Sequence, residues 1–277
     1  MPELIYPSAP LLGAVTDILR YLDARKQAEE LAREHGLKVA DMPLATQAMG
    51  HHPEVRAVVR HHWIDTISVE CHGFRDNTRS YEAWHSVGSM ATEKGLEDAI
   101  PTGGAYAFMP IAHDEWAAVG KGSYDVKNIV RVDNLMDLRA GNIPAAGAPY
   151  TISLMIPEGY RLIPLATDTK EVIDMHGAGK LILFERGELN ADQFRMDDRV
   201  ASVCGSPENV EILHGILFGK KEGGGEGRSS FGSYHRIHEL GFGNVPMSRP
   251  LFLGNLGYDG LSGYDGLNNY ARFLGVR

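Results

Sequence analysis

Apolar residues in the N-terminal part of the chain recur at the spacing of one helix face. They predict an amphipathic helix over residues 11–33. Gly36 is the predicted stop signal, since glycine accepts the positive φ that follows a helix. Asp41 is a residue type that caps helix N-termini, and Pro43 suits a first helical turn, so a short helix closed by Gly50 is predicted next. The apolar stripe of the first helix consists of Leu11, Leu12, Val15, Ile18, Leu19 and Leu22.

The apolar period changes after a further short helix, predicted over residues 53–62. Between residues 67 and 72 apolar and polar residues alternate, which predicts a half-buried strand with Glu70 and His72 together on its polar face. The turn-forming residues 157–159 predict a hairpin. Further strands are predicted over 106–111, 128–132, 150–156, 161–166, 180–184 and 200–204.

A second clear helix is predicted over residues 207–218, with Ser206 as its N-cap and Gly219 at its end. Strands that follow one another without alternating helices favour an α+β fold, with a mixed or mostly antiparallel sheet flanked by helices. We predict a single domain over residues 1–277. Its parts are an N-terminal helical segment (1–62), a sheet-rich body (63–205), and a helix, glycine-rich loop and C-terminal tail (206–277).

Composition and charge narrow the class of protein. Hydrophobic residues make up 43% and charged residues 23% of the 277, which is typical of a chain with a packed core. The net charge is −9 and no run of Lys and Arg is longer than two residues, so the basic footprint of a nucleic-acid partner is absent from the sequence. The start lacks a secretion signal and no apolar stretch suits a membrane span. We therefore expect a cytoplasmic protein with neither a membrane nor a nucleic-acid partner.

The chain has two cysteines, Cys71 and Cys204, and neither lies in a CxxC pair. This spacing argues against a disulfide framework and against a thiolate zinc site. We interpret both residues as small buried hydrophobic side chains within strands.

Histidine is enriched, with twelve residues in the chain. His235, His238 and Glu239 would share one face of a helix, because positions i, i+3 and i+4 are neighbours there. Glu70 and His72 would come from the strand described above. Imidazole and carboxylate are ligands of divalent metals, so we predict a site for zinc, with iron or manganese as alternatives. If no metal is bound, His235, His238 and Glu239 would lie at a solvated helix end, and Glu70 and His72 would lie on an exposed strand face.

A second group of histidines includes the sequence Gly50-His51-His52-Pro53, followed by the strand that carries His72. This order resembles the signature of the pterin-4a-carbinolamine dehydratases, in which a His-His-Pro sequence is likewise followed by a strand and a third histidine. The resemblance covers some 25 residues and lacks the aromatic residue that the family has after His-His-Pro. It implies metal-free acid–base removal of water by His51, His52 and His72.

A glycine-rich loop is predicted over residues 219–232, where six of fourteen residues are glycine. The loop would be either a mobile lid, in which Lys220 and Arg228 hold a small anionic substrate, or a plain flexible linker. The loop matches neither of the glycine-rich nucleotide-binding motifs, because it follows a helix.

The C-terminal tail contains a short repeat, since Gly257–Leu261 and Gly263–Leu267 have the same sequence, Gly-Tyr-Asp-Gly-Leu. Two copies are too few for a solenoid. We interpret them as consecutive turns that present two tyrosines, as for docking onto a neighbouring subunit, and we expect a homo-oligomer.

Three functions follow from these features. The first is a metal-dependent hydrolase or lyase for a small anionic organic molecule, with Glu70 as general base and the cation polarising a carbonyl or activating water. The second is the metal-free dehydratase implied by His51 and His52. The third is a non-catalytic binding or assembly protein, favoured by the repeated tail and by the lack of a complete catalytic motif.

Overall fold

A computed structural model of the chain describes most of its residues. The described ranges are 19–53, 55–56, 64–99, 109–125, 127–145, 147–155, 162–163, 182–183, 187–189, 191–218, 229–231, 245–253, 261–263, 270–271 and 273–276. The helices are α2 (Tyr21–Glu34), α3 (Met42–His51), α5 (Glu93–Ala99), α6 (His113–Gly120), α7 (Leu135–Arg139), α9 (Ala191–Met196), α10 (Asp198–Cys204) and α11 (Pro207–Phe218), with the 3-10 helix η1 (Ser89–Ala91).

The strands vary widely in length. They are β1 (Leu19–Arg20), β2 (Lys38–Val39), β3 (Ile64–Arg75), β4 (Thr78–His85), β5 (Met109–Pro110), β6 (Ser123–Tyr124), β7 (Lys127–Asn128), β8 (Val130–Val132), β9 (Tyr150–Met155), β10 (Leu162–Ile163), β11 (Ile182–Leu183), β12 (Gly187–Leu189), β13 (Ser229–Phe231), β14 (Met247–Leu253), β15 (Leu261–Gly263), β16 (Tyr270–Ala271) and β17 (Gly275–Val276).

A central sheet organises the described part of the chain. Its strand order is β15-β14-β3-β4-β9-β8, and β5 also pairs with β14. Neighbouring strands are antiparallel except for the parallel pair β8–β9. The longest strands, β3 and β4, form a hairpin whose two-residue turn consists of Asp76 and Asn77 at positive φ. The predicted α+β class, with a mixed and mostly antiparallel sheet flanked by helices, is confirmed.

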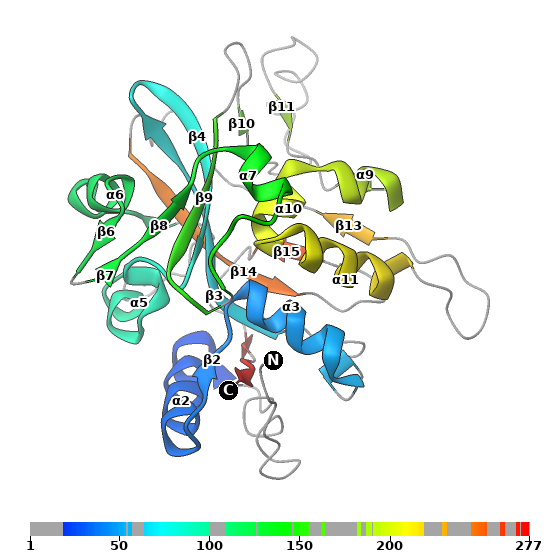
Figure 1. The fold of residues 1–277 in the computed structure, drawn as a ribbon. Coiled ribbons are helices and arrows are strands. Elements are labelled where there is room, and N and C mark those ends of the chain that lie inside the picture. The colour runs from blue at the N-terminus through cyan, green and yellow to red at the C-terminus, as the bar shows by residue number, and fades with distance from the viewer. Residues whose placement is uncertain are drawn as a thin grey trace, which may run out of the picture.

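Helices cover both faces of this sheet (Figure 1). Helices α3, α10 and α11 share one buried cluster with Tyr81 of β4 and Ile152 of β9. Helices α2, α5 and α6 contribute to a second cluster with Val69 and Cys71 of β3 and Trp84 of β4. Because successive side chains of a strand point to opposite faces, each long strand contributes to both clusters.

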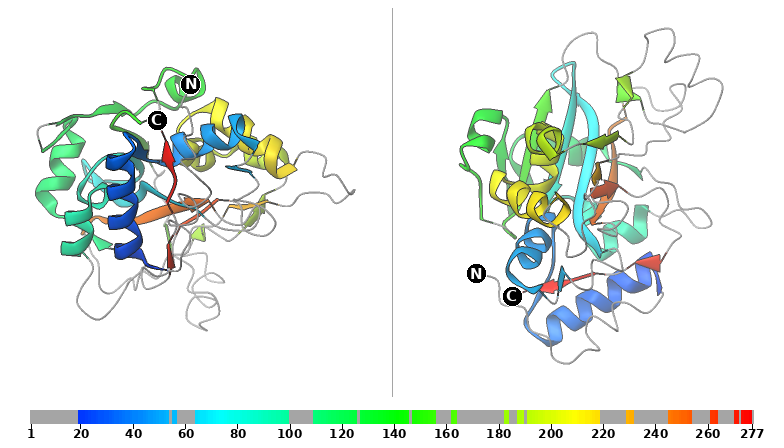
Figure 2. Two further views of the ribbon diagram at one scale, coloured as in Figure 1. Left: turned by 90° about the horizontal axis from the view of Figure 1, so that it is seen from below. Right: turned by 90° about the vertical axis from the view of Figure 1, so that its right-hand side faces the viewer.

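The C-terminal strands return to the N-terminal part of the chain. Strand β17 pairs with β2, β16 pairs with β1, and Phe273 forms an isolated bridge with Asp65 of β3. Figure 2 shows α2 beside β2 and β17 at one end of the sheet. Residues far apart in sequence therefore close the same end of the fold.

Two predicted helices are confirmed together with their caps. Helix α3 follows Asp41, whose Oδ1 accepts a hydrogen bond from Leu44 N at 2.9 Å. Helix α11 begins at Pro207, and the hydroxyl of Ser206 accepts one from Asn209 N at 3.0 Å. Gly36 has a φ of 66°, as expected of a residue that ends a helix. None of the described helices has both the length and the apolar character needed to cross a bilayer.

Other predictions were wrong. The segment 200–204 belongs to helix α10 and not to a strand, because Asp197 caps its N-terminus and Gly205 ends it at a φ of 81°. A short apolar run does not distinguish a strand from a buried helix. The first helix begins at Tyr21, and Leu19 lies in β1. Cys204 is therefore buried in a helix, whereas Cys71 is buried in a strand as predicted.

The remaining predicted strands are partly confirmed. Residues 150–156 correspond to β9, whereas 128–132 are divided between β7 and β8. Within 161–166 and 180–184 only the two-residue strands β10 and β11 are described, and they pair with each other in parallel. The predicted hairpin turn at 157–159 lies outside the described residues. Strand β4 was not predicted at all.

Candidate functional site

Glu70 and His72 lie on one face of β3, opposite Val69 and Cys71, as their spacing predicts. This face is covered: Glu70 is 0% and His72 8% exposed. The exposed strand face that served as the structural alternative is therefore wrong, because the helical layer packs onto it. Tyr81 of β4 lies between the two residues: its hydroxyl donates to Glu70 Oε2 at 3.1 Å, and its ring contacts the His72 ring edge-on at 5.1 Å between centroids.

The other predicted ligands of the metal site are not among the described residues. His235, His238 and Glu239 lie outside the described residues, as do Lys220 and Arg228 of the glycine-rich loop. Among the residues that the structure describes, no three or more His, Cys, Asp or Glu side chains are grouped so as to hold a metal ion. The metal site thus stays a prediction.

The histidines of the His-His-Pro sequence lie at the end of a helix. His51 is the last residue of α3 and is exposed, and His52 is its half-buried C-cap residue. His72 belongs instead to the central sheet and is buried there beside Tyr81. The acid–base dehydratase therefore also stays a prediction.

A buried Ser–His pair lies on the same face of the sheet as Glu70. Ser68 Oγ accepts from Met42 N at 2.8 Å and lies 2.8 Å from His85 Nδ1, and His85 Nε2 lies 2.9 Å from Ser202 O. A carbonyl oxygen only accepts, so Nε2 carries the ring proton and Ser68 donates to Nδ1. Burial lowers the pKa of His85 to about 4.

A serine hydroxyl beside a histidine can act as a nucleophile with its base, but this pair is closed off from solvent. Ser68 and His85 are both 0% exposed, and each of their polar atoms bonds within the fold. A substrate could not reach the hydroxyl without opening the helical layer. The pair therefore ties β3 and β4 to α3 and α10 and is not a catalytic site.

A buried carboxylate organises the opposite face. Glu82 of β4 is 1% exposed and accepts from Arg75 Nε at 2.7 Å, from Trp84 Nε1 at 2.7 Å and from Ser80 Oγ at 3.2 Å. The guanidinium of Arg75 in turn stacks 3.7 Å above the ring of Trp116 in α6. Each partner of this cluster is satisfied inside the protein, so the cluster stiffens the β3–β4 hairpin and the helix beside it.

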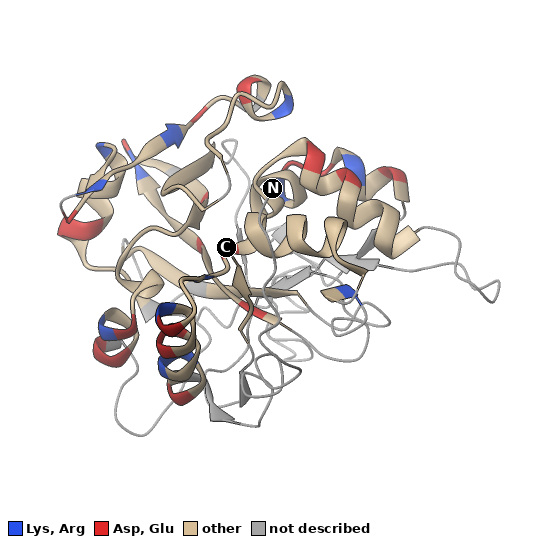
Figure 3. Ribbon diagram, turned by 60° about the horizontal axis from the view of Figure 1, so that its bottom comes forward, with Lys and Arg blue, Asp and Glu red and all other residues tan. Residues whose placement is uncertain are grey.

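The described helices carry charges of both signs. Figure 3 shows Lys and Arg interspersed with Asp and Glu along α2 and α5. These two helices are joined by ion pairs of Lys26 with Glu93, at 3.8 Å, and with Glu97. These two helices therefore present faces of mixed charge.

The C-terminal segment is the remaining candidate. Residues 254–270 run from the end of β14 to the first residue of β16, and they contain the two Gly-Tyr-Asp-Gly-Leu copies. Among them the structure describes β15, which forms the edge of the central sheet, and β16. The first copy ends at Leu261 within β15 and the second begins at Gly263, also within β15. The tyrosines of both copies lie outside the described residues.

The chain on either side of this segment is firmly anchored. Before it, Leu251 and Leu253 of β14 are 2% and 0% exposed, and the Leu251 carbonyl accepts from Thr66 Oγ1 at 2.7 Å. After it, Phe273 and Leu274 are 1% and 2% exposed, and the Leu274 carbonyl accepts from Ala40 N at 2.8 Å. The segment therefore begins and ends in the rigid core.

The composition of this segment is unlike that of the strands around it. Twelve of its seventeen residues are Gly, Asn, Tyr or Ser, and it contains no Lys, Arg or Glu. Recognition loops of binding proteins are enriched in these same residues, because Tyr supplies contact area at low entropic cost and Ser, Gly and Asn supply adaptable hydrogen bonds. The repeat was visible in the sequence, but its attachment to two core strands was not.

The sequence matches no known protein family, and no curated protein sequence matches it. A solved structure with a similar fold is described as showing accommodation of massive sequence variation in Nanoarchaeota by the C-type lectin fold. It is 15% identical, and the match covers 87% of this chain and 88% of that one with a TM-score of 0.52. At this identity the likeness concerns the fold alone: the arrangement of this chain is similar to the C-type lectin fold.

Proposed function

We propose that this protein is a binding protein that recognises a macromolecular partner through residues 254–270. The observation that carries the proposal is the contrast within one stretch of chain: a segment composed mainly of Gly, Asn, Tyr and Ser lies between buried anchors, Leu251 and Leu253 before it and Phe273 and Leu274 after it. Binding residues are often placed in this way, on loops that a rigid scaffold positions.

The structural neighbour supports this proposal through the property for which it is described. In that protein the C-type lectin fold accommodates massive sequence variation. We infer that the present chain likewise separates a stable body from a segment whose side chains can change. The anchors of the segment, Leu253 and Phe273, belong to the body and would stay constant.

The chemistry of the segment indicates what it would contact. Tyr258 and Tyr264 would provide flat apolar area with a hydroxyl at the tip, while Asp259 and Asp265 would make the segment acidic. With no cation in the segment, a neutral or basic protein surface is favoured over an acidic one. A second copy of this chain would be one such partner, and binding to it through this segment would form the expected homo-oligomer.

The test measures binding to arrays of folded proteins and of glycans, and it compares the wild-type chain with the double variant Tyr258→Ala/Tyr264→Ala. The control is Met136→Ala, because Met136 is 77% exposed on α7, outside the segment. Removal of two tyrosine anchors should weaken binding by about a hundredfold or more, while the control binds as the wild type does. Binding to no arrayed protein, or equal binding by the double variant, would refute the proposal.

A metal-dependent hydrolase or lyase is the second proposal. It is supported by Glu70 and His72 on one buried face of β3, which could supply two ligands or a ligand and a base. Elemental analysis of the purified protein tests it, with His72→Ala as the comparison. Stoichiometric zinc, iron or manganese that is lost in the variant would support this function, and a wild-type protein free of these metals would exclude it.

A further inference from the structure

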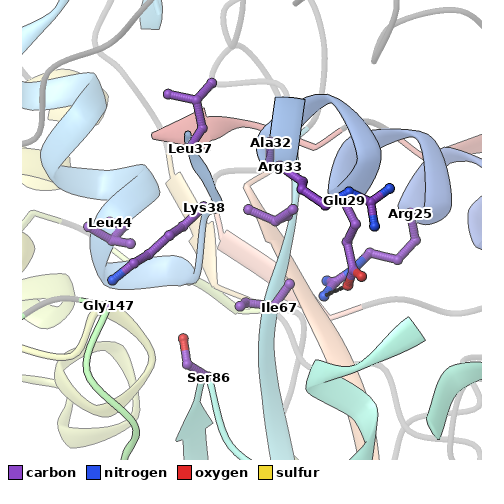
Figure 4. Close-up of a pocket in the computed structure, with 11 residues that line it drawn as sticks. Arg25, Glu29, Ala32, Arg33, Leu37, Lys38, Leu44, Ile67, Ser86 and Gly147 are labelled. Atoms are coloured by element: carbon purple, nitrogen blue, oxygen red, sulfur yellow. Dashed lines mark hydrogen bonds and ion pairs between the residues drawn. The ribbon is translucent and has the colours of Figure 1, made fainter. Parts of the chain in front are cut away.

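A cavity of about 410 Å³ lies between α2, β2, the start of α3 and the adjoining ends of β3 and β4. Four of its lining residues, Arg25, Glu29, Ala32 and Arg33, come from one side of α2: Arg25, Glu29 and Arg33 follow one another at intervals of four residues, and Ala32 lies three residues after Glu29. Figure 4 shows this wall on one side and Lys38 on the other. The cavity has the size of a small-molecule site.

The α2 wall carries excess positive charge. Arg25 donates to Glu29 Oε1 through Nε at 2.8 Å and Nη2 at 2.6 Å, so these two charges neutralise each other. Arg33 is exposed, and no described residue forms an ion pair with it. In a chain of net charge −9, this end of the cavity is positive.

The guanidinium of Arg25 is also incompletely satisfied. Its side chain is 3% exposed and its Nη2 donates to Ala91 O at 2.8 Å, but the buried Nη1 has no hydrogen-bond partner among the described residues. A buried donor without a partner is unfavourable, and more so when it is charged. Because Arg25 lines the cavity, a small shift of its side chain would let Nη1 donate to a ligand oxygen and so complete this guanidinium's hydrogen bonding.

The opposite side of the cavity is balanced in charge. Lys38 there lies near Asp41, which is 0% exposed and accepts from Ser86 Oγ at 2.8 Å and from Leu44 N at 2.9 Å. Burial raises the pKa of Asp41. The cavity and its edge carry three cations, Arg25, Arg33 and Lys38. They carry two anions, Glu29 and Asp41, so the net charge is +1 when all five groups are ionised.

The middle of the cavity is apolar. It is lined by Leu37, Val39, Leu44 and Ile67, and the small side chain of Ala32 on the α2 wall leaves room for a ligand there. An inorganic anion would leave these side chains in contact with water, whereas a hydrocarbon body would cover them. The lining therefore fits a molecule with one acidic end and one apolar end.

We propose that this cavity binds a small amphipathic organic anion, with its acidic group at Arg33 and Arg25 and its apolar body against Val39, Leu44 and Ile67. None of these residues belongs to the 254–270 segment or to the predicted metal site, so this proposal is independent of both proposed functions.

Titration calorimetry with octanoate tests the proposal, with 1-octanol and inorganic phosphate as probes that each lack one half of the chemistry. Octanoate should bind with a stoichiometry of one, and each of the other two at least about tenfold more weakly. Absence of octanoate binding would overturn the proposal. Phosphate binding as tight as octanoate binding would overturn it too, since the apolar wall would then contribute nothing.

Two variants locate the binding. Arg33→Gln should weaken octanoate binding by about tenfold, while the control Arg139→Gln, at an exposed residue of α7, should leave it unchanged. Ile67→Phe should block the cavity and abolish binding, with circular dichroism and thermal unfolding used to verify that it folds. If Ile67→Phe does not fold, the Arg33 comparison decides: equal octanoate affinity in Arg33→Gln and the wild type would contradict the assigned site.

Discussion

The β3–β4 hairpin and the 254–270 segment use polar residues in opposite ways. In the hairpin, Glu82 and His85 are 1% and 0% exposed, and their polar atoms are bonded to fixed partners inside the fold. The segment is made mostly of small polar residues and tyrosine, and its ends are fixed by Leu253 and Phe273.

This difference separates two kinds of constraint. A buried polar group is restricted by its partner, because its removal leaves the partner desolvated and unpaired. A recognition residue is restricted by what it binds and not by the fold that carries it. Substitution should therefore unfold the protein in the hairpin but alter only binding in the segment.

The largest effect is expected for the buried ion pair of the hairpin. Arg75→Ala would leave Glu82 buried without its cation, and we expect the free energy of unfolding to fall by about 3–5 kcal/mol. Urea denaturation measures this value. The control is Arg195→Ala, which removes an exposed ion pair with Glu211 and should change stability by less than about 1 kcal/mol. Equal effects of the two substitutions would show that the hairpin cluster has no special role.

His85 should make stability depend on pH. Its pKa in the fold is about 4, below its ordinary value of 6.5, so the unfolded chain takes up a proton in a range where the folded chain does not. The contribution of His85 to the free energy of unfolding is fully present above pH 6.5. It falls by about 3 kcal/mol in all as the pH is lowered to 4. Urea denaturation of the wild type and His85→Gln across this range should show a shallower slope in the variant.

Two controls isolate that slope. Asp41, whose pKa is raised by burial, contributes in the opposite direction, but it is present in both proteins and cancels in the difference. His113→Gln removes an exposed histidine and should leave the slope unchanged. Parallel pH profiles of the wild type and His85→Gln would contradict the neutral, buried imidazole.

A smaller gain is expected at the turn of the hairpin. Asn77 has a φ of 64°, a conformation that glycine adopts without the steric strain of a side chain. Asn77→Gly should stabilise the protein by up to about 1 kcal/mol, as glycine is favoured in two-residue hairpin turns of this kind. Thermal unfolding measures it, and Asn142→Gly, outside the hairpin, is the comparison. A lower melting temperature for Asn77→Gly would argue against this turn geometry.

The smallest change in stability is expected in the segment. Tyr258→Ala/Tyr264→Ala should alter the free energy of unfolding by no more than about 0.5 kcal/mol for each residue, the range of ordinary surface substitutions. Urea denaturation of the double variant tests this. A loss of several kcal/mol would place the tyrosines in the core and remove the distinction between the two regions.

Features that depend on neighbouring residues were predictable from the sequence. The caps of α3 and α11, at Asp41 and Ser206, are signals within one turn of the helix. The common face of Glu70 and His72 follows from alternation along one strand. Each of these predictions needed only residues close together in the chain.

Features that depend on distant partners were missed or misjudged. Strand β4 was missed because its polar residues Ser80 and Glu82 suggest a loop until Arg75 and Ser153 are placed beside them. Glu70 is buried near Arg199 of α10, which comes from much later in the chain. The same holds for the segment, since β14 and β16 pair with β3 and β1, which come far earlier in the sequence.

The central claim is that residues 254–270 can vary in sequence while the fold stays intact and that they determine binding. Its most direct test is protease resistance of two displayed libraries. One randomises Tyr258, Asp259, Ser262, Tyr264 and Asp265, and the other randomises Ser68, Arg75, Ser80, Glu82 and His85 of the hairpin. The folded members of the first library would then be selected against one folded target protein.

We predict that most members of the segment library resist protease as the wild type does and yield binders to the target, whereas most members of the hairpin library are digested. Similar digestion of both libraries, or a folded segment library without binders, would contradict the account.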